Sequence, residues 1–326
     1  MIKPYPYDEN TKEIRYDTAV GLVQEKVDEI LSRSPSIVRK YTSHLVSSKG
    51  KNIRAKLLLI CAEDEQGTIP QNAITLAVAI EVLHLATLVH DDVMDDAKLR
   101  RGKVTLQKMY GKKTAVICGD YLLCEALKVA GSITNKEEYS SIDLPNYMNK
   151  VCLGELSQHV NNGNLDLSVY QYLKIISGKT AALFEASCYA GAYLSKSNET
   201  NIKRYRQLGY ILGMIFQLTD DCIDFESTET VALKPVQSDY EQGVITLPLI
   251  HAFEMITALK DKASHTKLSR NEINEAVKKS GGLTFTRMIV QRYYKKALRF
   301  IHTLEDADMK KEKLIDILEK VSRVTK

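Results

Sequence analysis

Apolar residues recur with the period of an α-helix along almost the whole chain, and this pattern limits the possible folds more than any other feature. We find no convincing alternation of period two with hairpin punctuation, which a half-buried strand would show. Glycine and proline are sparse, at 16 and 7 of 326 residues, and they fall where periodic segments end. The sequence therefore predicts an all-α protein of roughly ten to twelve helices.

The most apolar segment, 74–89, carries apolar residues on all sides, which is typical of a helix in the middle of a bundle. Glu81 and His84 interrupt it, so we do not expect it to cross a membrane. No linker divides the chain, and we expect one domain over residues 1–326 built around central helices. The first residues lack the apolar stretch of a signal peptide, so the expected location is the cytoplasm.

The composition is that of an ordinary globular protein, with 44% hydrophobic and 26% charged residues. Its 45 basic and 41 acidic residues are spread along the chain and give no support to a nucleic-acid partner. The Lys-rich segment 309–326 has the spacing of a solvated amphipathic helix. The six cysteines form no CxxC pair or Cys/His cluster, and we expect them to be reduced core residues.

Two segments with the pattern Asp-Asp-x-x-Asp each follow a long apolar helical pattern: DDVMD at 91–95, the first aspartate motif, and DDCID at 220–224, the second. Positions i and i+4 of a helix are neighbours, so the outer aspartates of each motif repel one another unless a cation lies between them. A single such motif is more often a solvated charge patch, but two in equivalent places favour a metal site. The spacing excludes an EF-hand loop, and no Cys/His set suits zinc.

Magnesium suits these motifs because it prefers oxygen ligands and is usually held by one or two carboxylates together with substrate phosphates. The sequence also supplies cations for phosphates, since Arg100 and Arg101 follow the first motif and Lys179 lies between the two. Arginine can grip a phosphate in a bidentate fork. No GxxxxGK[ST] loop occurs, so a P-loop nucleotide site is excluded.

A further basic group, Lys51 and Arg54, lies at a predicted helix start, where backbone N–H groups favour anions. Taken alone, these residues would more often be surface charges, and His84 a core histidine. Together with Arg101 they could form a second diphosphate site beside the first. Two diphosphate sites imply two diphosphate substrates.

These residues belong to an ordered series of motifs, and with it the chain resembles the trans-isoprenyl diphosphate synthases over nearly its whole length. The resemblance is strongest to medium- and long-chain bacterial members such as the catalytic subunits of heptaprenyl diphosphate synthase. The series comprises 51–54, the first aspartate motif with Arg100-Arg101-Gly102, Gly119-Asp120-Tyr121, Gly154-Glu155 with Gln158, Lys179-Thr180-Ala181, Phe216-Gln217 with the second motif, and Thr246-Leu247-Pro248.

The resemblance implies a helical bundle around a deep central cavity, with both aspartate motifs at its mouth. It implies head-to-tail condensation of isopentenyl diphosphate with an allylic diphosphate, which yields an all-trans polyprenyl diphosphate and pyrophosphate. The implied cofactor is Mg²⁺, with three ions when the diphosphate is bound. A homodimer is the default assembly, because two-fold dimers dominate soluble oligomers and the family usually forms one.

Matching motifs also imply a role for each site residue. Asp91, Asp95 and Asp220 would be the main Mg²⁺ ligands, with support from Asp92, Asp221 and Asp224. Arg100 and Lys179 would bind the allylic diphosphate, whereas Lys51, Arg54, His84 and Arg101 would bind isopentenyl diphosphate. Thr180 and Gln217 would present oxygen dipoles to the carbocation.

The chain departs from the family pattern in four places. Asn52 and Ala55 replace the usual Arg and Pro, which weakens the expected isopentenyl diphosphate site. Leu233 replaces a Gly, and Val244 stands where short-chain members often carry a Lys. Long-chain members often lack that Lys too, so Val244 bears on the subclass more than on activity.

Product length is expected to depend on residues one and two turns before the first motif. Ala86 and Thr87 occupy positions where members that stop at farnesyl tend to carry an aromatic residue, and neither is bulky. We therefore expect a product longer than farnesyl. Leu83, Ile80 and Met148 are candidates for residues deeper in the cavity that stop the growing chain. Simple core packing is the equally weighted alternative for each of them.

Three other functions stay open at this point. A class I terpene cyclase also ionises diphosphates, but it needs only one diphosphate site. A non-catalytic partner subunit would be expected to lose motif residues, and both motifs are complete here. The chain could also be the catalytic half of a heterodimer that needs a small partner.

Overall fold

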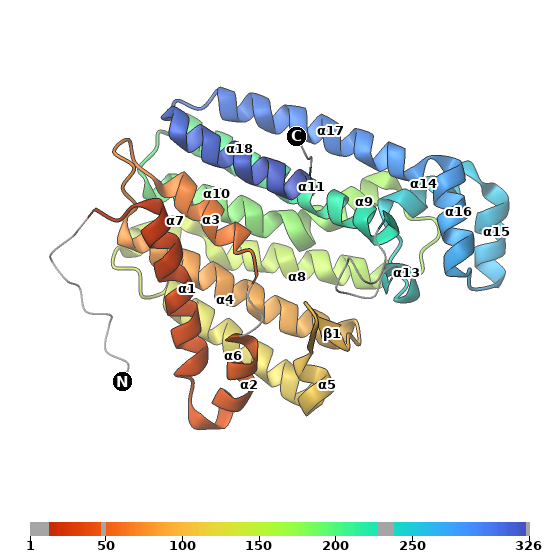
Figure 1. Cartoon of the computed structure of the whole chain (residues 1–326), viewed down its shortest axis with the longest axis horizontal. Helices are drawn as coiled ribbons and strands as arrows, with labels where there is room; N and C mark the ends of the chain where they lie inside the picture. The colour runs from red at the N-terminus through yellow and green to blue at the C-terminus, as the bar shows by residue number, and fades with distance from the viewer. Residues whose placement is uncertain (1–12, 47–49, 227–237, 324–326) are drawn as a thin grey trace. The chain divides into compact units, whose positions relative to one another are not determined.

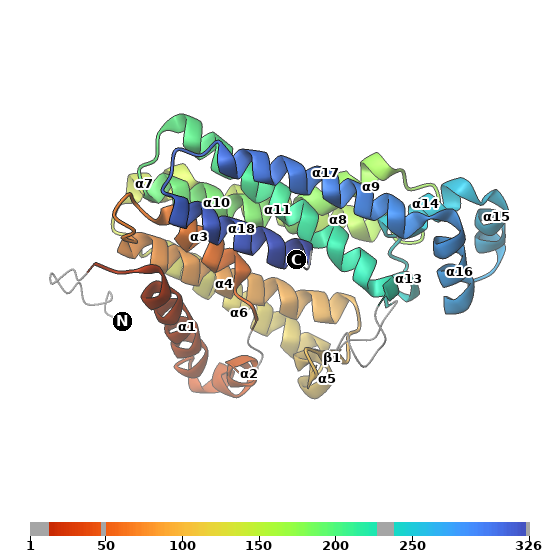
Figure 2. The same cartoon turned by 45° about the horizontal axis from the view of Figure 1, so that its top comes forward.

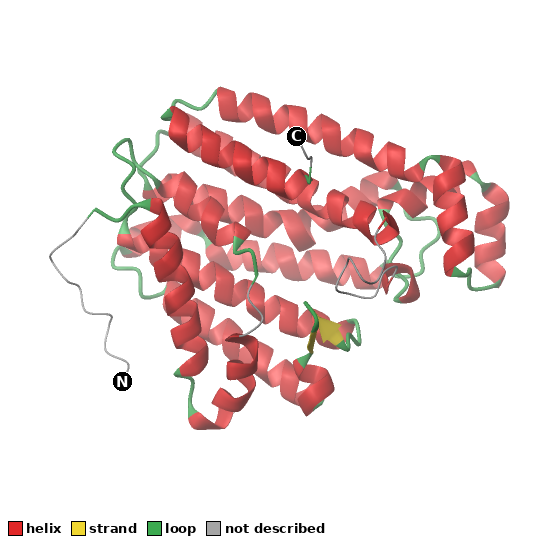
Figure 3. Ribbon diagram, viewed as in Figure 1, coloured by secondary structure: helices red, strands yellow, loops and turns green. Residues whose placement is uncertain are grey.

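The fold is seen in a computed structural model that describes residues 13–46, 50–226 and 238–323 (Figure 1). Helices make up nearly all of it, and the strands in the described residues form one short hairpin (Figure 3). The prediction of an all-α fold is confirmed. The described residues contain more helical segments than the ten to twelve expected, because breaks such as the one at Ile256 divide longer periodic stretches into short helices.

The chain divides into two compact units. Unit 1 comprises the described residues of 1–144, 186–206 and 305–314, and unit 2 those of 145–185, 207–304 and 315–326. Four helices contribute residues to both units: α8 (Leu144–Val160), of which only the first residue belongs to unit 1, α10 (Ala182–Leu194), α11 (Glu199–Glu226) and α18 (Asp308–Ser322). A single domain and its central cavity stay predictions.

Unit 1 is built mainly from the first half of the chain. Its elements are α1 (Tyr16–Ser32), α2 (Ser36–Val46), α3 (Ile53–Ala62), α4 (Gln71–Met94), β1 (Leu99–Arg100), β2 (Lys103–Val104), α5 (Leu106–Tyr110), α6 (Lys112–Ala130) and α7 (Lys136–Ile142). Helices α4 and α6 lie side by side (Figures 1 and 2), and α3 and α1 also pack on α4.

Helix α4 is the core helix of unit 1, as its sequence predicts. Its apolar residues from Ala73 to Leu83 are almost all buried, and Ala86 and Val89 are buried as well. By length and hydropathy α4 would pass for a membrane span, but 67% of its most apolar window is buried inside the protein. A helix covered on all sides needs apolar residues on all sides, which explains the pattern.

A buried polar cluster ties the end of α3 to the start of α18 within unit 1. The Lys310 ammonium donates to the backbone carbonyls of Cys61 (3.2 Å) and Glu63 (2.9 Å) and pairs with Asp306 at 3.0 Å. The Tyr205 hydroxyl donates to the other oxygen of Asp306 at 2.8 Å. Lys310 is therefore an exception to the solvated helix predicted for the Lys-rich end, because its charge is fully partnered inside the protein.

Unit 2 contains the remaining elements. They are α8 (Leu144–Val160), α9 (Val169–Ile176), the π-helical turn η1 (Ser177–Ala181), α13 (Ser238–Glu241), α14 (Leu247–Met255), α15 (Thr257–His265), α16 (Arg270–Ser280) and α17 (Gly282–His302). Helix α14 packs against α16 and α17, and the buried run Ile211–Ile215 of α11 belongs to the same unit.

The cysteines follow the sequence prediction only in part. Cys61, Cys118, Cys188 and Cys222 are buried and unbridged. Cys124 on α6 and Cys152 on α8 are exposed, so the expectation that they lie in the core was wrong. Both helices carry apolar residues on more than one face, and periodicity alone does not say which face is covered.

Candidate active site

The first aspartate motif lies where α4 ends. The helix stops at Met94, and Asp95 is its C-cap, whose N–H donates to the carbonyl of Asp91 at 2.8 Å. This bond keeps Asp91 and Asp95 one turn apart, as the spacing predicts. The middle residue, Asp92, is only 6% exposed, whereas the outer two are partly exposed. The outer carboxylates are therefore the more accessible pair for a cation.

A hairpin directly after the motif presents the two arginines. Leu99–Arg100 pairs with Lys103–Val104, and the turn residues Arg101 and Gly102 both have positive φ, at 52° and 75°. Two positive φ values match a type I′ turn, in which glycine at the second position is favoured. Sequence analysis missed this hairpin because two-residue strands are too short to show alternation. The Arg-Gly pair is the signal that marks the turn.

Arg100 is bound to the motif itself. Its Nε lies 2.5 Å from Asp92 Oδ1 in a charge-assisted hydrogen bond. Burial raises the pKa of Asp92, and the neighbouring Arg100 partly opposes that rise. The predicted ligand of the allylic diphosphate is thus held beside the motif by the buried middle aspartate.

Three of the four residues predicted to bind isopentenyl diphosphate, Arg54, His84 and Arg101, lie near one another in unit 1. Arg54 lies in the first turn of α3, and its Nη1 is 3.1 Å from His84 Nε2 on α4. Burial and the nearby charges of Arg54 and Arg101 hold the pKa of His84 well below its usual value. His84 is therefore neutral near pH 7 and accepts the Arg54 hydrogen bond. Burial also lowers the pKa of Arg54, to about 10, which leaves it charged.

Glu81 belongs to this cluster, although sequence analysis assigned it no role. Its carboxylate accepts the backbone N–H of Ala55 at 3.1 Å, so a side chain of α4 caps the start of α3. Burial raises the pKa of Glu81, while Arg54 and Arg101 lower it. Arg101 lies against Gly50, where an added Cβ would be 2.8 Å from its Nη1. A carboxylate in an apolar helix, three residues before His84, was the signal that could have found it.

The structure shows a local reason for Asn52, which stands where the family usually has Arg. Asn52 precedes α3 with φ 50° and ψ 40°, the left-handed conformation that Asn tolerates better than most residues. Its side-chain amide donates to Gln24 of α1 at 2.8 Å. The residue therefore shapes the entry to α3, and Lys51 beside it is exposed.

The second aspartate motif lies in the last turns of α11, in unit 2. Asp221, 1% exposed, accepts hydrogen bonds on both carboxylate oxygens. The Tyr172 hydroxyl donates to Oδ2, and Gln217 Nε2 donates to Oδ1 at 3.0 Å. Gln217 Oε1 in turn accepts the Thr180 hydroxyl at 2.7 Å. Burial raises the pKa of Asp221 to about 8, although both hydrogen bonds act in the opposite direction. Tyr172 was not predicted, because nothing in the local sequence pattern links it to the motif.

Lys179 and Thr180 lie in the π-helical turn η1, a kind of turn that is frequent at functional sites. A Cβ on Gly154 of α8 would lie 2.1 Å from the Lys179 backbone nitrogen, so only glycine allows this approach. The Lys179 ammonium pairs with Glu155 at 2.9 Å. The Gly-Glu and Lys-Thr motifs are therefore partners, each with a definite contact in the other.

Gly119 and Asp120 lie beside the first motif. A Cβ on Gly119 would be 2.3 Å from the His90 ring, and His90 Nε2 is 3.2 Å from Asp120 Oδ1. His90 immediately precedes Asp91, so this contact holds the end of α4 against α6.

The predicted chain-length residues lie on α4. Leu83 and Ala86 are buried, and the Thr87 hydroxyl donates to the carbonyl of His84 at 2.8 Å. Their role stays a prediction. Val244 is half-buried, with its N–H bonded to the carbonyl of Asp239 at 2.8 Å, and Leu233 falls outside the described residues.

The chemistry of the donor set fits magnesium. Within residues 13–46, 50–226 and 238–323, no group of three or more His, Cys, Asp or Glu side chains converges as a ready-made metal site. The motifs are suited to a metal that completes its shell with substrate oxygens, which is the habit of Mg²⁺. Asp91, Asp95 and Asp220 are partly exposed and Asp224 is buried, and their role as Mg²⁺ ligands stays a prediction.

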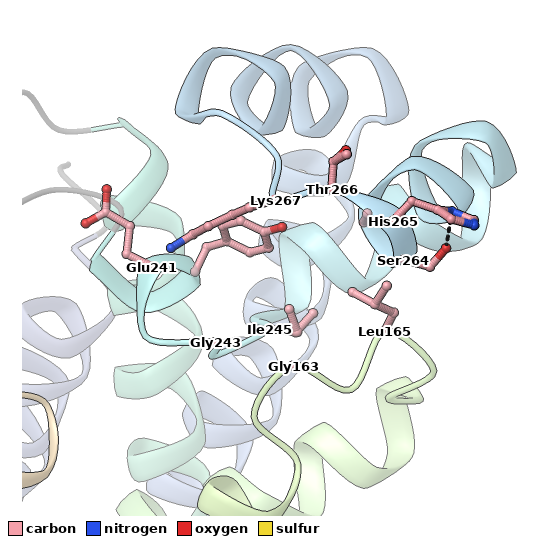
Figure 4. Close-up of a pocket in the computed structure, with 11 residues that line it drawn as sticks. Gly163, Leu165, Glu241, Gly243, Ile245, Ser264, His265, Thr266 and Lys267 are labelled. Atoms are coloured by element: carbon pink, nitrogen blue, oxygen red, sulfur yellow. Dashed lines mark hydrogen bonds between the residues drawn. The ribbon is translucent and has the colours of Figure 1, made fainter.

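A separate pocket of about 570 Å³ opens on unit 2 (Figure 4). Its lining includes Leu165, Tyr240, Ile245, Ser264, His265 and Lys267. None of the predicted site residues lines it.

The sequence is similar to those of known proteins over most of its length. The chain matches the family model described as Polyprenyl synthetase over residues 35–280. It is 32% identical over 291 residues to heptaprenyl diphosphate synthase component 2 of Bacillus subtilis, covering 87% of this chain and 82% of that protein. Octaprenyl diphosphate synthase of Escherichia coli is 28% identical over 291 residues, with 87% and 89% covered.

Solved structures give the same result. Heptaprenyl diphosphate synthase from Staphylococcus aureus superposes with a TM-score of 0.87 at 28% identity and covers 97% of this chain and 100% of that one. Polyprenyl synthase from Caulobacter crescentus, solved with calcium and isoprenyl diphosphate, has a TM-score of 0.84 at 28% identity with the same coverage.

An all-α fold, two Asp-Asp-x-x-Asp helix ends and a basic cluster near the first of them define the class of isoprenoid synthases that act on diphosphates. Within that class the chain belongs to the polyprenyl synthetase family, and it is a prenyltransferase of the trans-isoprenyl diphosphate synthase kind.

Proposed function

We propose that the chain joins isopentenyl diphosphate head to tail to an allylic diphosphate and makes an all-trans polyprenyl diphosphate longer than farnesyl. The observation that carries this proposal is the cluster of Arg54, His84 and Arg101 in the same unit as the first aspartate motif. A terpene cyclase needs one diphosphate site, whereas this cluster offers a second. The named relatives that make heptaprenyl and octaprenyl chains support the product class.

The chain's own residues prepare the ionisation of the allylic substrate. Arg100 and Lys179 bind its diphosphate, and each is already oriented by a carboxylate, Asp92 for Arg100 and Glu155 for Lys179. Mg²⁺, when bound by the outer aspartates, supplies positive charge to the departing diphosphate oxygens. Preorganised charges of this kind act without reorganisation, which lowers the barrier to breaking the allylic C–O bond.

Thr180 and Gln217 face the resulting carbocation with oxygen dipoles. The double bond of isopentenyl diphosphate, held by Lys51, Arg54, His84 and Arg101, then attacks the cation. A proton must leave the adduct, and the released pyrophosphate is the base. His84 does not serve as this base, because its Nε2 already accepts from Arg54.

The direct test is elongation by the purified chain. Incubation with Mg²⁺, labelled isopentenyl diphosphate and farnesyl diphosphate should give labelled products longer than farnesyl, separated by reversed-phase chromatography after removal of the phosphates. Cyclised hydrocarbon products would favour a terpene cyclase. The absence of any elongation by the chain alone would contradict the proposal for the isolated chain and favour the heterodimeric alternative.

We further propose a homodimer as the working assembly. Helix α6 exposes Val116 and Ile117, the latter at 59%, and α8 exposes Leu153, Leu156 and Val160. Exposed apolar side chains at helical spacing suit an interface between subunits. The Bacillus subtilis relative is named as component 2, which supports a heterodimer as the second candidate. Light scattering on the wild-type chain and on Ile117→Lys tests this, because a dimer held through α6 should dissociate in the variant, whereas an unchanged mass would contradict this interface.

A further inference from the structure

We propose that Tyr172 is a positioning residue for the reaction: through Asp221 it fixes the orientation of Gln217 and hence of Thr180. The proposal rests on the function proposed above and deepens it, since it assigns a role to a residue outside every motif of the sequence. The Tyr172 hydroxyl bonds to the carboxylate of Asp221, and it acts on Gln217 and Thr180 through that carboxylate.

Asp221 is held in place by two neighbouring side chains. Its two carboxylate oxygens have different donors, the Tyr172 hydroxyl on one and the Gln217 amide on the other. With both oxygens engaged and 1% of the residue exposed, the carboxylate has one favoured rotation. Loss of either donor would leave a buried carboxylate oxygen unsatisfied, which is costly.

Two contacts fix the orientation of the Gln217 amide. A glutamine amide carries a donor end and an acceptor end. Oδ1 of Asp221 accepts from the Nε2 end of Gln217, and this contact turns Oε1 toward Thr180. The Thr180 hydroxyl gives its one proton to Oε1, and its oxygen lone pairs are left as the part available to a cation.

Tyr172 lies on the helix that leads into the π-helical turn. Tyr172 is 1% exposed on α9, a helix whose start is fixed by a capping box between Ser168 and Gln171. Helix α9 runs directly into η1, which carries Lys179 and Thr180. The hydroxyl of Tyr172 therefore links the helix before the π-helical turn to the aspartate motif of α11, and all of these residues lie in unit 2.

The test compares Tyr172→Phe with a matched control, Tyr205→Phe. Tyr205 is also fully buried, and its hydroxyl also donates to an aspartate, Asp306, in the polar cluster of unit 1 that holds no predicted site residue. Each variant loses one buried Tyr–Asp hydrogen bond. Steady-state kinetics with both substrates and thermal unfolding are measured for wild type and both variants.

We expect Tyr172→Phe to lower kcat about 10- to 100-fold, because displaced catalytic groups cost that much, with KM for isopentenyl diphosphate changed less than about twofold. Tyr205→Phe should lower Tm without changing kcat. In an Asp221→Asn background, Tyr172→Phe should have little further effect on kcat, because the carboxylate through which Tyr172 acts is already removed.

Equal kinetic behaviour of the two variants would overturn the proposal, and so would full additivity of Tyr172→Phe with Asp221→Asn. If wild type elongates and Tyr172→Phe keeps its kcat, only the role of Tyr172 is lost. If wild type itself fails to elongate, the proposed function falls and this inference with it.

Discussion

The two aspartate motifs share a sequence pattern, but their middle aspartates bind different partners. In each, the middle aspartate is buried and bonded to protein donors while the outer aspartates of the first motif and Asp220 of the second are partly exposed. Asp92 is paired with the guanidinium of Arg100, whereas Asp221 accepts from the neutral groups of Tyr172 and Gln217. The first motif therefore carries a permanent countercharge at its buried carboxylate, and the second carries dipoles.

On the proposed function, this difference gives the two motifs different roles. Unit 1 gathers Arg54, Arg100 and Arg101 around the first motif, which suits it to anionic substrates. The contacts of Asp221 in unit 2 instead orient Thr180 and Gln217, groups suited to a carbocation. The comparison can be tested by variants that remove each element in turn.

The largest effect is expected from the outer aspartates. Asp91→Asn should lower kcat by about 1,000-fold or more, because the first motif loses an accessible anionic ligand for Mg²⁺. Asp220→Asn should have an effect of similar order. Elongation of labelled isopentenyl diphosphate measures both, and circular dichroism checks that the variants are folded. A loss of less than about tenfold would show that the outer aspartates are not the main ligands.

The basic cluster of unit 1 should control one substrate more than the other. Arg101→Gln is expected to raise KM for isopentenyl diphosphate about tenfold, with KM for the allylic diphosphate changed less than about twofold. Arg204→Gln is the matched control, because Arg204 lies in the same unit and pairs with Glu305 away from the predicted site. Equal changes in both KM values would remove the distinction between the two diphosphate sites.

The buried second motif should give stability a distinctive pH dependence. The folded pKa of Asp221 is raised to about 8, so the folded chain keeps a proton that the unfolded chain releases near pH 4. Stability from this group is complete below the unfolded pKa and is lost as pH rises toward 8, by up to about 1.4 kcal/mol per pH unit. Unfolding by urea between pH 5 and pH 8, without metal or substrate, measures it. Asp221→Asn should flatten that dependence, and an unchanged slope would contradict the assignment.

The smallest expected effect concerns the helix that leads into the first motif. Ala86→Phe should shorten the product by adding a bulky side chain one turn before Asp91, with rates of the first condensation largely kept. Chromatography of the dephosphorylated products measures the chain length. Products no shorter than those of wild type would disprove the proposal that the growing chain passes the position of Ala86.

The helices and motifs could be predicted because their signals are local. The all-round apolar pattern of 74–89 follows from burial in α4, and the aspartate spacing follows from the helical turn. The clustering of Arg54, His84 and Arg101 was also anticipated, and the structure brings these residues together. The hairpin around Arg101-Gly102 was not predicted, because its strands have only two residues each and are too short to show an alternating pattern.

The sequence by itself determined the helical class and the family and supplied the proposed site residues, because these depend on periodicity and on residue types at fixed spacing. Only the tertiary structure decided how those residues are held. Glu81 caps α3 from another helix, Lys310 is buried against distant carbonyls, and Tyr172 reaches Asp221 across 49 positions. Such contacts join segments far apart in the chain, and no local pattern records them, because their stability comes from burial that exists only after folding.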